Sequence, residues 1–234
     1  MTSFSFKDID SVLIVAELSA NHNGSLETAK ETIKAAKRAG ADAIKLQTYT
    51  SETITLNCNS EDFIIRNKSI WDGMKYSELY QKAHTPWDWH EELFKISKEE
   101  DILCFSSPFD KSAVDLLEGL GNPIYKIASF EITDIPLIKY IASKNKPIIL
   151  STGIAETEDI DLALKTIREN GNCEIALLKC VSSYPAKISE SNLSMIPYFS
   201  RNYNVVTGLS DHTKGIISPV VAVSMGAKII EKHF

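Results

Sequence analysis

The sequence lacks any apolar run long enough to cross a bilayer. Its first ten residues also lack the basic segment and apolar stretch of a signal peptide, so we expect a cytoplasmic protein with no membrane partner. Cysteine is scarce as well, and none of the four residues forms a CxxC pair: Cys58, Cys104, Cys173 and Cys180. This pattern is typical of reduced thiols that serve mostly as packing residues.

An excess of positive charge is also missing, since the formal net charge is -6. We therefore expect no nucleic-acid partner, because phosphate backbones attract basic surfaces. Any anion-binding site must then be locally basic, against the overall sign of the protein. A glycine-rich phosphate loop is absent after the first apolar run, which disfavours a doubly wound dinucleotide-binding sheet.

The chain does contain a regular alternation of short apolar runs and helical segments. The apolar runs predict eight strands buried on both faces, at residues 12–16, 42–47, 102–105, 124–127, 147–150, 175–178, 205–208 and 228–231. The segments between them predict seven helices, at residues 25–39, from 86 onward, 111–118, 135–143, 158–169, 193–200 and 215–225. Residues 48–85 are a long polar and aromatic connection without clear periodicity, which is typical of a functional loop.

Strict strand–helix alternation predicts a parallel sheet with right-handed crossovers, and eight strands are enough to close a (β/α)8 TIM barrel. We therefore expect one barrel domain over residues 1–234. The last predicted strand ends close to Phe234, so the eighth helix of a complete barrel is absent. We expect a fragment of a longer protein, or a barrel whose open side is covered by another subunit.

Each predicted strand ends in at least one polar residue. In a barrel the carboxyl ends of the strands converge, so residues distant in the sequence become neighbours. A single Lys after a strand is usually a solvated charge, and a single Ser is usually a turn or cap residue. Eight strands with polar ends on one face argue for a site that contains Glu17, Lys45, Gln47, Ser107, Lys126, Ser129, Glu131, Ser151, Ser182, Tyr184, Ser210, His212, Glu231 and His233.

Two kinds of chemistry are present in this set. Lys45 and Lys126 interrupt apolar strands, where an ammonium group is costly unless an anion meets it. Together with serine hydroxyls they predict a pocket for a phosphate or a carboxylate, with Ser107, Ser129 and Ser151 as the nearest candidates.

His212 and His233 follow adjacent strands, so the barrel predicts that they face each other across one pocket. Two imidazoles with Glu17 or Glu231 nearby suit a divalent cation such as Mn²⁺, Zn²⁺ or Fe²⁺, with positions open for substrate. A general acid–base pair is the alternative interpretation of the two histidines.

Six segments in this order resemble the sialic acid synthase family, and the resemblance covers nearly all of residues 12–234. The motifs are AELSANHNG at 16–24, IKLQT at 44–48, YKIASFE at 125–131, LSTG at 150–153, GLSDHT at 208–213 and IEKHF at 230–234. Within the family, the first and third motifs, with SSPFDK at 106–111, are most similar to the pseudaminic acid synthases.

The resemblance implies a transferase that condenses phosphoenolpyruvate with a 2,4-diacetamido-2,4,6-trideoxy hexose in its open-chain aldehyde form. The products are a nonulosonic acid and phosphate. It implies a divalent metal held by His212 and His233, Mn²⁺ first and Mg²⁺ or Co²⁺ otherwise. Glu17, Lys45 and Lys126 join the histidines as catalytic residues. The other implied contacts are to the substrates: Gln47, Ser107, Ser129, Glu131, Ser151, Ser182, Tyr184, Ser210 and Glu231.

Two departures from the family pattern bear on function. Synthases that make N-acetylneuraminate carry Asn where this chain has Ser182, which indicates a different acceptor sugar. The family's C-terminal antifreeze-like domain, which reaches across a homodimer, is absent from this chain. Three alternatives therefore stay open: an N-acetylneuraminate or legionaminate synthase, an inactive barrel that only binds phosphoenolpyruvate and metal, and an aldolase with Lys126 as Schiff-base lysine.

Overall fold

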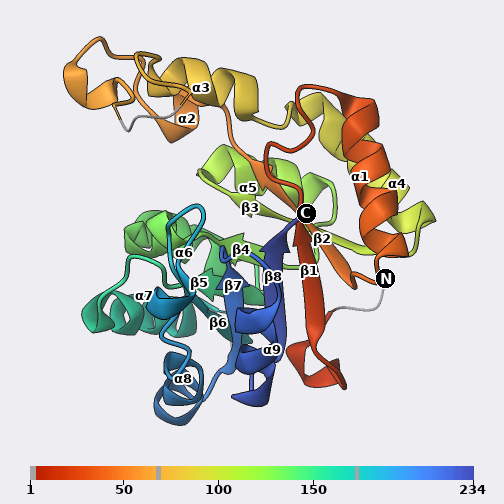
Figure 1. The fold of residues 1–234 in the computed structure, drawn as a ribbon, viewed down its shortest axis with the longest axis vertical. Helices are drawn as coiled ribbons and strands as arrows, with labels where there is room; N and C mark the ends of the chain where they lie inside the picture. The colour runs from red at the N-terminus through yellow and green to blue at the C-terminus, as the bar shows by residue number, and fades with distance from the viewer. Residues whose placement is uncertain (1–3, 67–69, 172–173) are drawn as a thin grey trace.

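A computed structural model describes residues 4–66, 70–171 and 174–234, and it shows a closed parallel barrel of eight strands (Figure 1). Each strand pairs with the next along the chain, and β8 returns to β1, with Leu13 opposite Ile229 and Glu17 opposite His233. The strands are β1 (Leu13–Glu17), β2 (Ala43–Thr48), β3 (Leu103–Pro108), β4 (Tyr125–Ile127), β5 (Ile148–Ser151), β6 (Ile175–Cys180), β7 (Val206–Asp211) and β8 (Ile229–His233).

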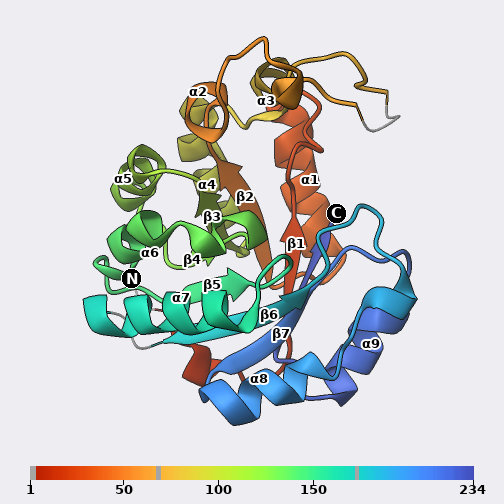
Figure 2. The same ribbon diagram turned by 90° about the vertical axis from the view of Figure 1, so that its left-hand side faces the viewer.

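Within the described residues, the connections between successive strands include seven helices that lie outside the sheet (Figure 2). Side chains at their amino ends begin several of them: Ser25, Asp110 and Asp134 each accept a backbone N–H of the first turn. The connecting helices are α1 (Leu26–Arg38), α4 (His90–Glu99), α5 (Lys111–Gly119), α6 (Ile135–Ala142), α7 (Thr157–Asn170), α8 (Met195–Tyr203) and α9 (Ile217–Ser224). The predicted alternation, and with it the TIM barrel, is confirmed.

The structure differs from the sequence prediction in two places. The helix expected from Pro86 begins at His90, because a 3-10 turn at Trp87–Trp89 precedes it. The connection after β2 contains two helices that were not predicted, α2 (Ser51–Ile54) and α3 (Tyr76–Ala83). No residue of α3 is buried, but four of its residues have the spacing of one helical face: Tyr76, Leu79, Tyr80 and Ala83. The signal for this helix was therefore present in the sequence and was overlooked.

Helices α2 and α3 belong to an extension that stands above the strand ends of the barrel (Figures 1 and 2). Among the described residues no helix follows β8, and the outer side chain of Ile14 on β1 is 40% exposed. None of the helices in the described ranges combines the length and the hydropathy that a bilayer span requires. Cys173 lies outside those ranges, whereas Cys104 and Cys180 are buried and Cys58 is partly buried, all three as free thiols.

The core has an inner and an outer part, as the alternation of side chains along each strand requires. Val15, Phe105, Ile149 and Leu178 pack inside the barrel, whereas larger clusters lie between the sheet and its helices. The interior is tight at Gly208 on β7. A Cβ atom built there would lie 2.3 Å from the carbonyl oxygen of Ile229 and 2.7 Å from Cδ2 of Leu178.

We predict that Gly208→Ala lowers the free energy of unfolding by about 1–3 kcal/mol, because the barrel must shift to accept one methyl group. Gly119→Ala is the matched control, since a Cβ atom at Gly119, in α5, meets nothing within 4 Å. Chemical denaturation of the two variants and the parent measures the difference. Equal stabilities for the two variants would contradict this account of the interior.

Candidate active site

Polar residues gather in one cavity of about 110 Å³ at the carboxyl ends of the strands. Its position follows from the parallel order, which brings all eight strand ends to one face. The predicted residues that line it are Glu17, Lys45, Gln47, Lys126, Ser129, Glu131, Ser151, Tyr184, Ser210, His212 and Glu231. His233 lies beside the cavity against His212, while Ser107 and Ser182 lie outside its wall.

An ion triad occupies the base of the cavity. The Nζ atom of Lys45 lies 2.9 Å from Glu17 Oε1 and 3.0 Å from Glu231 Oε1, and all three side chains are buried. Burial by itself lowers the pKa of Lys45, but the two carboxylates outweigh burial and raise that pKa above its usual value. The sequence predicts an anion beside Lys45, and the protein itself supplies it in the carboxylates of Glu17 and Glu231.

Lys126 is the second buried lysine, and its surroundings differ. Its Nζ donates to Ser151 Oγ at 2.7 Å and to the carbonyl oxygen of Ile127 at 3.0 Å. Among the described residues no carboxylate lies within 4.0 Å of this ammonium group. Burial accordingly lowers the pKa of Lys126, although the more distant Glu231 opposes the effect. Lys126 is thus the cation with capacity left for an external anion.

Four side-chain oxygens of the predicted set are buried and have no hydrogen-bond partner among the described residues: Ser107 Oγ, Glu131 Oε2, Ser182 Oγ and Glu231 Oε2. Folded proteins satisfy nearly all such groups, so a cluster of exceptions indicates a site that a ligand completes. Ser129 is partly satisfied, because its Oγ accepts the N–H of Gly153 at 3.1 Å. The unpartnered oxygens on Glu131 and Glu231 belong to residues that line the cavity.

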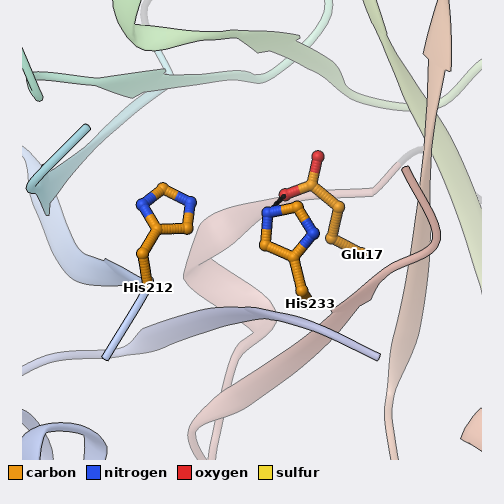
Figure 3. Close-up of side chains that lie close together, drawn as sticks. All are labelled: Glu17, His212 and His233. Atoms are coloured by element: carbon orange, nitrogen blue, oxygen red, sulfur yellow. Dashed lines mark ion pairs between the residues drawn. The ribbon is translucent and has the colours of Figure 1, made fainter. Parts of the chain in front are cut away.

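The two histidines face each other as the barrel predicted, with ring centroids 5.3 Å apart. Figure 3 shows both rings beside the carboxylate of Glu17, and candidate ligand atoms of these three residues all lie within 4.8 Å of one another. His212 Nδ1 is 2.8 Å from the carbonyl oxygen of Val181, which leaves Nε2 of His212 for a ligand. A second partner that fixes the ring is the usual support of a metal-binding histidine.

The donor set of two imidazoles and one carboxylate therefore fits a divalent cation of the Mn²⁺, Fe²⁺ or Zn²⁺ type. The sequence left Glu17 and Glu231 as equal candidates for the carboxylate, and the structure favours Glu17, whose Oε2 lies 3.6 Å from His233 Nε2. Burial lowers the pKa of His233. For His212 burial acts the same way but is outweighed by Cys180 and the Val181 carbonyl, which raise its pKa.

An ion pair on the outer face of the sheet lies directly behind the histidines. Lys232 Nζ donates to Asp211 Oδ2 at 2.5 Å, and these two residues are register partners across β7 and β8. Asp211 Oδ1 also accepts the backbone N–H and the hydroxyl of Thr213. The pair fixes the register of the two strands from which His212 and His233 project.

Sequence reasoning missed four cavity residues: Phe109, Ala128, Phe130 and Cys180. Cys180 was interpreted as a packing thiol, yet its Sγ lies 3.7 Å from His212 Nδ1. Its place at the end of β6 could have included it among the strand-end residues. Phe130 stands between Ser129 and Glu131 in a motif that was singled out only for its polar members. An apolar residue at a strand end gives no signal of its own.

Glu131 generates a pH prediction, because burial raises its pKa from 4.5 to about 7. The unfolded chain ionises near pH 4.5 while the folded protein keeps the proton until about pH 7, so the folded state loses stability across this interval. Glu131→Gln should therefore increase the free energy of unfolding at pH 8, by about 3 kcal/mol, and have little effect at pH 4.

Urea denaturation at both pH values measures this difference. Glu99→Gln on the exposed surface of α4 is the matched control and should show the same small effect at both. A gain for Glu131→Gln that did not depend on pH would show that the carboxylate is not held in its protonated form.

Comparison with known proteins agrees with this geometry. The model of the NeuB family matches residues 32–234. The chain is 50% identical over 223 residues to the pseudaminic acid synthase of Campylobacter jejuni subsp. jejuni serotype O:2, covering 95% of this chain and 65% of that protein. The pseudaminic acid synthase of Helicobacter pylori is 51% identical over 221 residues, with 94% of this chain and 65% of that protein covered.

Among solved structures, the N-acetylneuraminic acid (sialic acid) synthetase of Leptospira borgpetersenii, in complex with citrate, superimposes with a TM-score of 0.85. It is 35% identical, and the match covers 100% of this chain and 78% of that one. The present chain thus spans slightly less than two thirds of the length of the two pseudaminic acid synthases. On its sequence and on its barrel, the chain belongs to the NeuB family, the family of the sialic acid synthases.

Proposed function

We propose that this chain is the barrel domain, residues 1–234, of a pseudaminic acid synthase. The reaction joins phosphoenolpyruvate to the aldehyde of a 2,4-diacetamido-2,4,6-trideoxy hexose of the altrose type and releases phosphate. The observation that carries the proposal is the pairing of a buried lysine, Lys126, with a neighbouring cluster of Glu17, His212 and His233. The identity to the two pseudaminic acid synthases supports the choice of acceptor.

Phosphoenolpyruvate carries a carboxylate and a phosphate, and the cavity offers cationic and hydroxyl groups to both. Lys126 has no close carboxylate partner, and it already donates to Ser151, which holds the two groups together. Ser129 and Ser210 supply further hydroxyls in the cavity, and Ser210 donates to Glu231 at 3.2 Å. Ser107 lies outside the cavity wall, and its buried Oγ without a partner is a further proposed contact. Lys45 offsets the negative charge of Glu17 and Glu231 at the buried base, which reduces their repulsion of an anionic substrate bound at Lys126.

The acceptor aldehyde would lie at the histidine pair. His212, His233 and Glu17 would hold the cation, for which we propose Mn²⁺, with Mg²⁺ or Co²⁺ as alternatives, and a bound divalent cation polarises a carbonyl oxygen as a Lewis acid. Tyr184 covers both histidines, with its ring centroid 4.2 Å from that of His212 and 5.8 Å from that of His233. Gln47, Glu131, Ser182 and Tyr184 are the proposed contacts to the sugar.

The proposed reaction forms one carbon–carbon bond and breaks one carbon–oxygen bond. C3 of phosphoenolpyruvate forms a bond to the aldehyde carbon, and the aldehyde oxygen takes a proton to become a hydroxyl. Water adds to C2 and gives one proton to the new hydroxyl at the former aldehyde carbon. The bond between C2 and the bridging oxygen then breaks, the C2 hydroxyl becomes a ketone, and its proton leaves with phosphate. Glu17 lies where it can handle the proton of this water, since Gln47 and Lys45 hold its carboxylate in place.

The remaining proposals concern the whole protein, of which this chain covers a part. We propose a homodimer acting in the cytoplasm, in which a C-terminal domain beyond this barrel completes the sugar site. An N-acetylneuraminate or legionaminate synthase, which would catalyse the same chemistry on a different acceptor sugar, is the alternative to a pseudaminic acid synthase. For this chain by itself, the alternative is a barrel that binds phosphoenolpyruvate and metal without turnover.

A phosphate-release assay tests the proposed function. We expect phosphate only when phosphoenolpyruvate, a divalent cation and the diacetamido-trideoxy sugar are all present, and none in excess EDTA. Full activity in EDTA would exclude the metal, and a preference for N-acetylmannosamine would exclude the proposed acceptor. Another outcome is that calorimetry shows binding of phosphoenolpyruvate by the chain without turnover. If addition of a C-terminal domain then gives activity, the barrel binds the substrate but needs that domain for catalysis.

The metal site has a separate test by electron paramagnetic resonance with Mn²⁺. Loss of a residue that only supports a metal ligand weakens metal binding roughly tenfold to hundredfold. His212→Ala and His233→Ala each remove a ligand, so each should weaken Mn²⁺ binding by at least this factor. His84→Ala, on the extension and outside the cavity, is the matched control and should bind as the parent does. Unchanged Mn²⁺ affinity in both site variants would refute the assignment.

A further inference from the structure

The cavity has two chemically different zones. Its base consists of buried charges, with Glu17, Lys45, Lys126 and Glu231 almost inaccessible to solvent. Two phenylalanines, Phe109 and Phe130, line the same cavity and carry no polar group. A ligand that fills both zones must therefore be strongly polar at one end and apolar at another.

Phe130 is 61% exposed, whereas the charged groups at the base of the same cavity are buried. It belongs to a 3-10 helix, Ser129–Thr133, in which Ser129 and Ile132 are the buried residues. With three residues per turn, these two share one side of the helix, so Phe130 points away from the core. Among the residues that the structure describes, no aromatic ring packs against Phe130, and its ring is free to receive a ligand.

Phe109 is held more firmly. Its ring packs edge to face on Tyr49, with centroids 5.3 Å apart, and Tyr49 is itself buried. Glu131, next to Phe130, carries a buried oxygen without a partner and also lines the cavity. The mouth therefore offers one unsatisfied polar atom and one open apolar ring on neighbouring residues, which together fit a group such as an acetamide, with its N–H and its methyl.

We propose that Phe130, with Phe109 beside it, is a specificity-determining residue that binds the methyl groups of the acceptor. These are the methyls of the acetamido groups and of a 6-deoxy carbon, so the rim selects an acetamido-deoxy sugar over a more hydroxylated one. A hydroxymethyl group in place of the methyl would bind less well, because contact with the ring would remove hydrogen bonds between its hydroxyl and water. The inference rests on the proposed function, and it explains why the enzyme would select this acceptor sugar.

Kinetics of Phe130→Ser and Phe130→Leu test the proposal. Phe130→Ser should raise KM for the diacetamido-trideoxy sugar about tenfold, because contact with one small apolar group is worth a factor of that order. KM for phosphoenolpyruvate should stay unchanged, since its site is at the charged base. Phe130→Leu keeps an apolar surface and should retain most of the affinity for the sugar.

Tyr198→Ala removes another exposed aromatic ring, on α8 away from the cavity, and should leave both constants unchanged. An unchanged KM for the sugar in Phe130→Ser would overturn the proposal, and so would an equal rise for both substrates. So would a change in oligomeric state without a change in sugar affinity, because Phe130 would then serve an interface between subunits.

A binding measurement keeps the inference separate from the proposed reaction. If the parent chain releases no phosphate, the barrel by itself does not turn over, and saturation-transfer NMR of the sugar decides the role of Phe130. We expect transfer from aromatic protons to the sugar methyl groups in the parent and its loss in Phe130→Ser. Absence of transfer in the parent would overturn the role of Phe130 as well.

Discussion

The ion triad of Glu17, Lys45 and Glu231 connects strands β1, β2 and β8, the three strands around the closure of the barrel. Removing one member of such a buried group leaves an uncompensated charge and costs about 3–5 kcal/mol. Glu17 also accepts from Gln47 and reaches His233, so the carboxylate that neutralises Lys45 is the one that faces the candidate metal site. Folding of the barrel and chemistry of the site thus depend on the same group.

The triad also separates the roles of the two lysines. Lys45 is neutralised by carboxylates of the protein, while Lys126 is bound only by neutral oxygens and is left to attract an external anion. Unpartnered oxygens on Glu131 and Glu231 show that the cavity is polar beyond what its own residues satisfy. The site therefore has a fixed charged base, an open cation and, on Phe109 and Phe130, an apolar rim.

Much of this arrangement was predictable, and the failures have local causes. The runs at 102–105 and 175–178 are apolar throughout because the strands there are buried on both faces, so the sequence marks them clearly. Helix α3 is eight residues long and buries no residue, so its apolar spacing is a short signal that was overlooked. Phe130 and Cys180 were missed because prediction of the site considered polar strand-end residues. A sequence motif does not show that the ring of Phe130 is exposed or that the thiol of Cys180 lies near the imidazole of His212.

Local sequence patterns were enough to predict the eight strands, their order and the convergence of polar residues at one face, because periodicity and alternation are local properties that any parallel barrel must satisfy. Family membership was also readable in six ordered motifs. Which charges pair could be seen in the folded structure alone, because Glu17 and Glu231 are equivalent candidates for a metal ligand when the sequence is considered by itself. Their 2.9 and 3.0 Å contacts to Lys45 arise from the twist and closure of the sheet. Closure likewise brings β8 back to β1, which places His233 and Glu17 on paired strands more than two hundred residues apart.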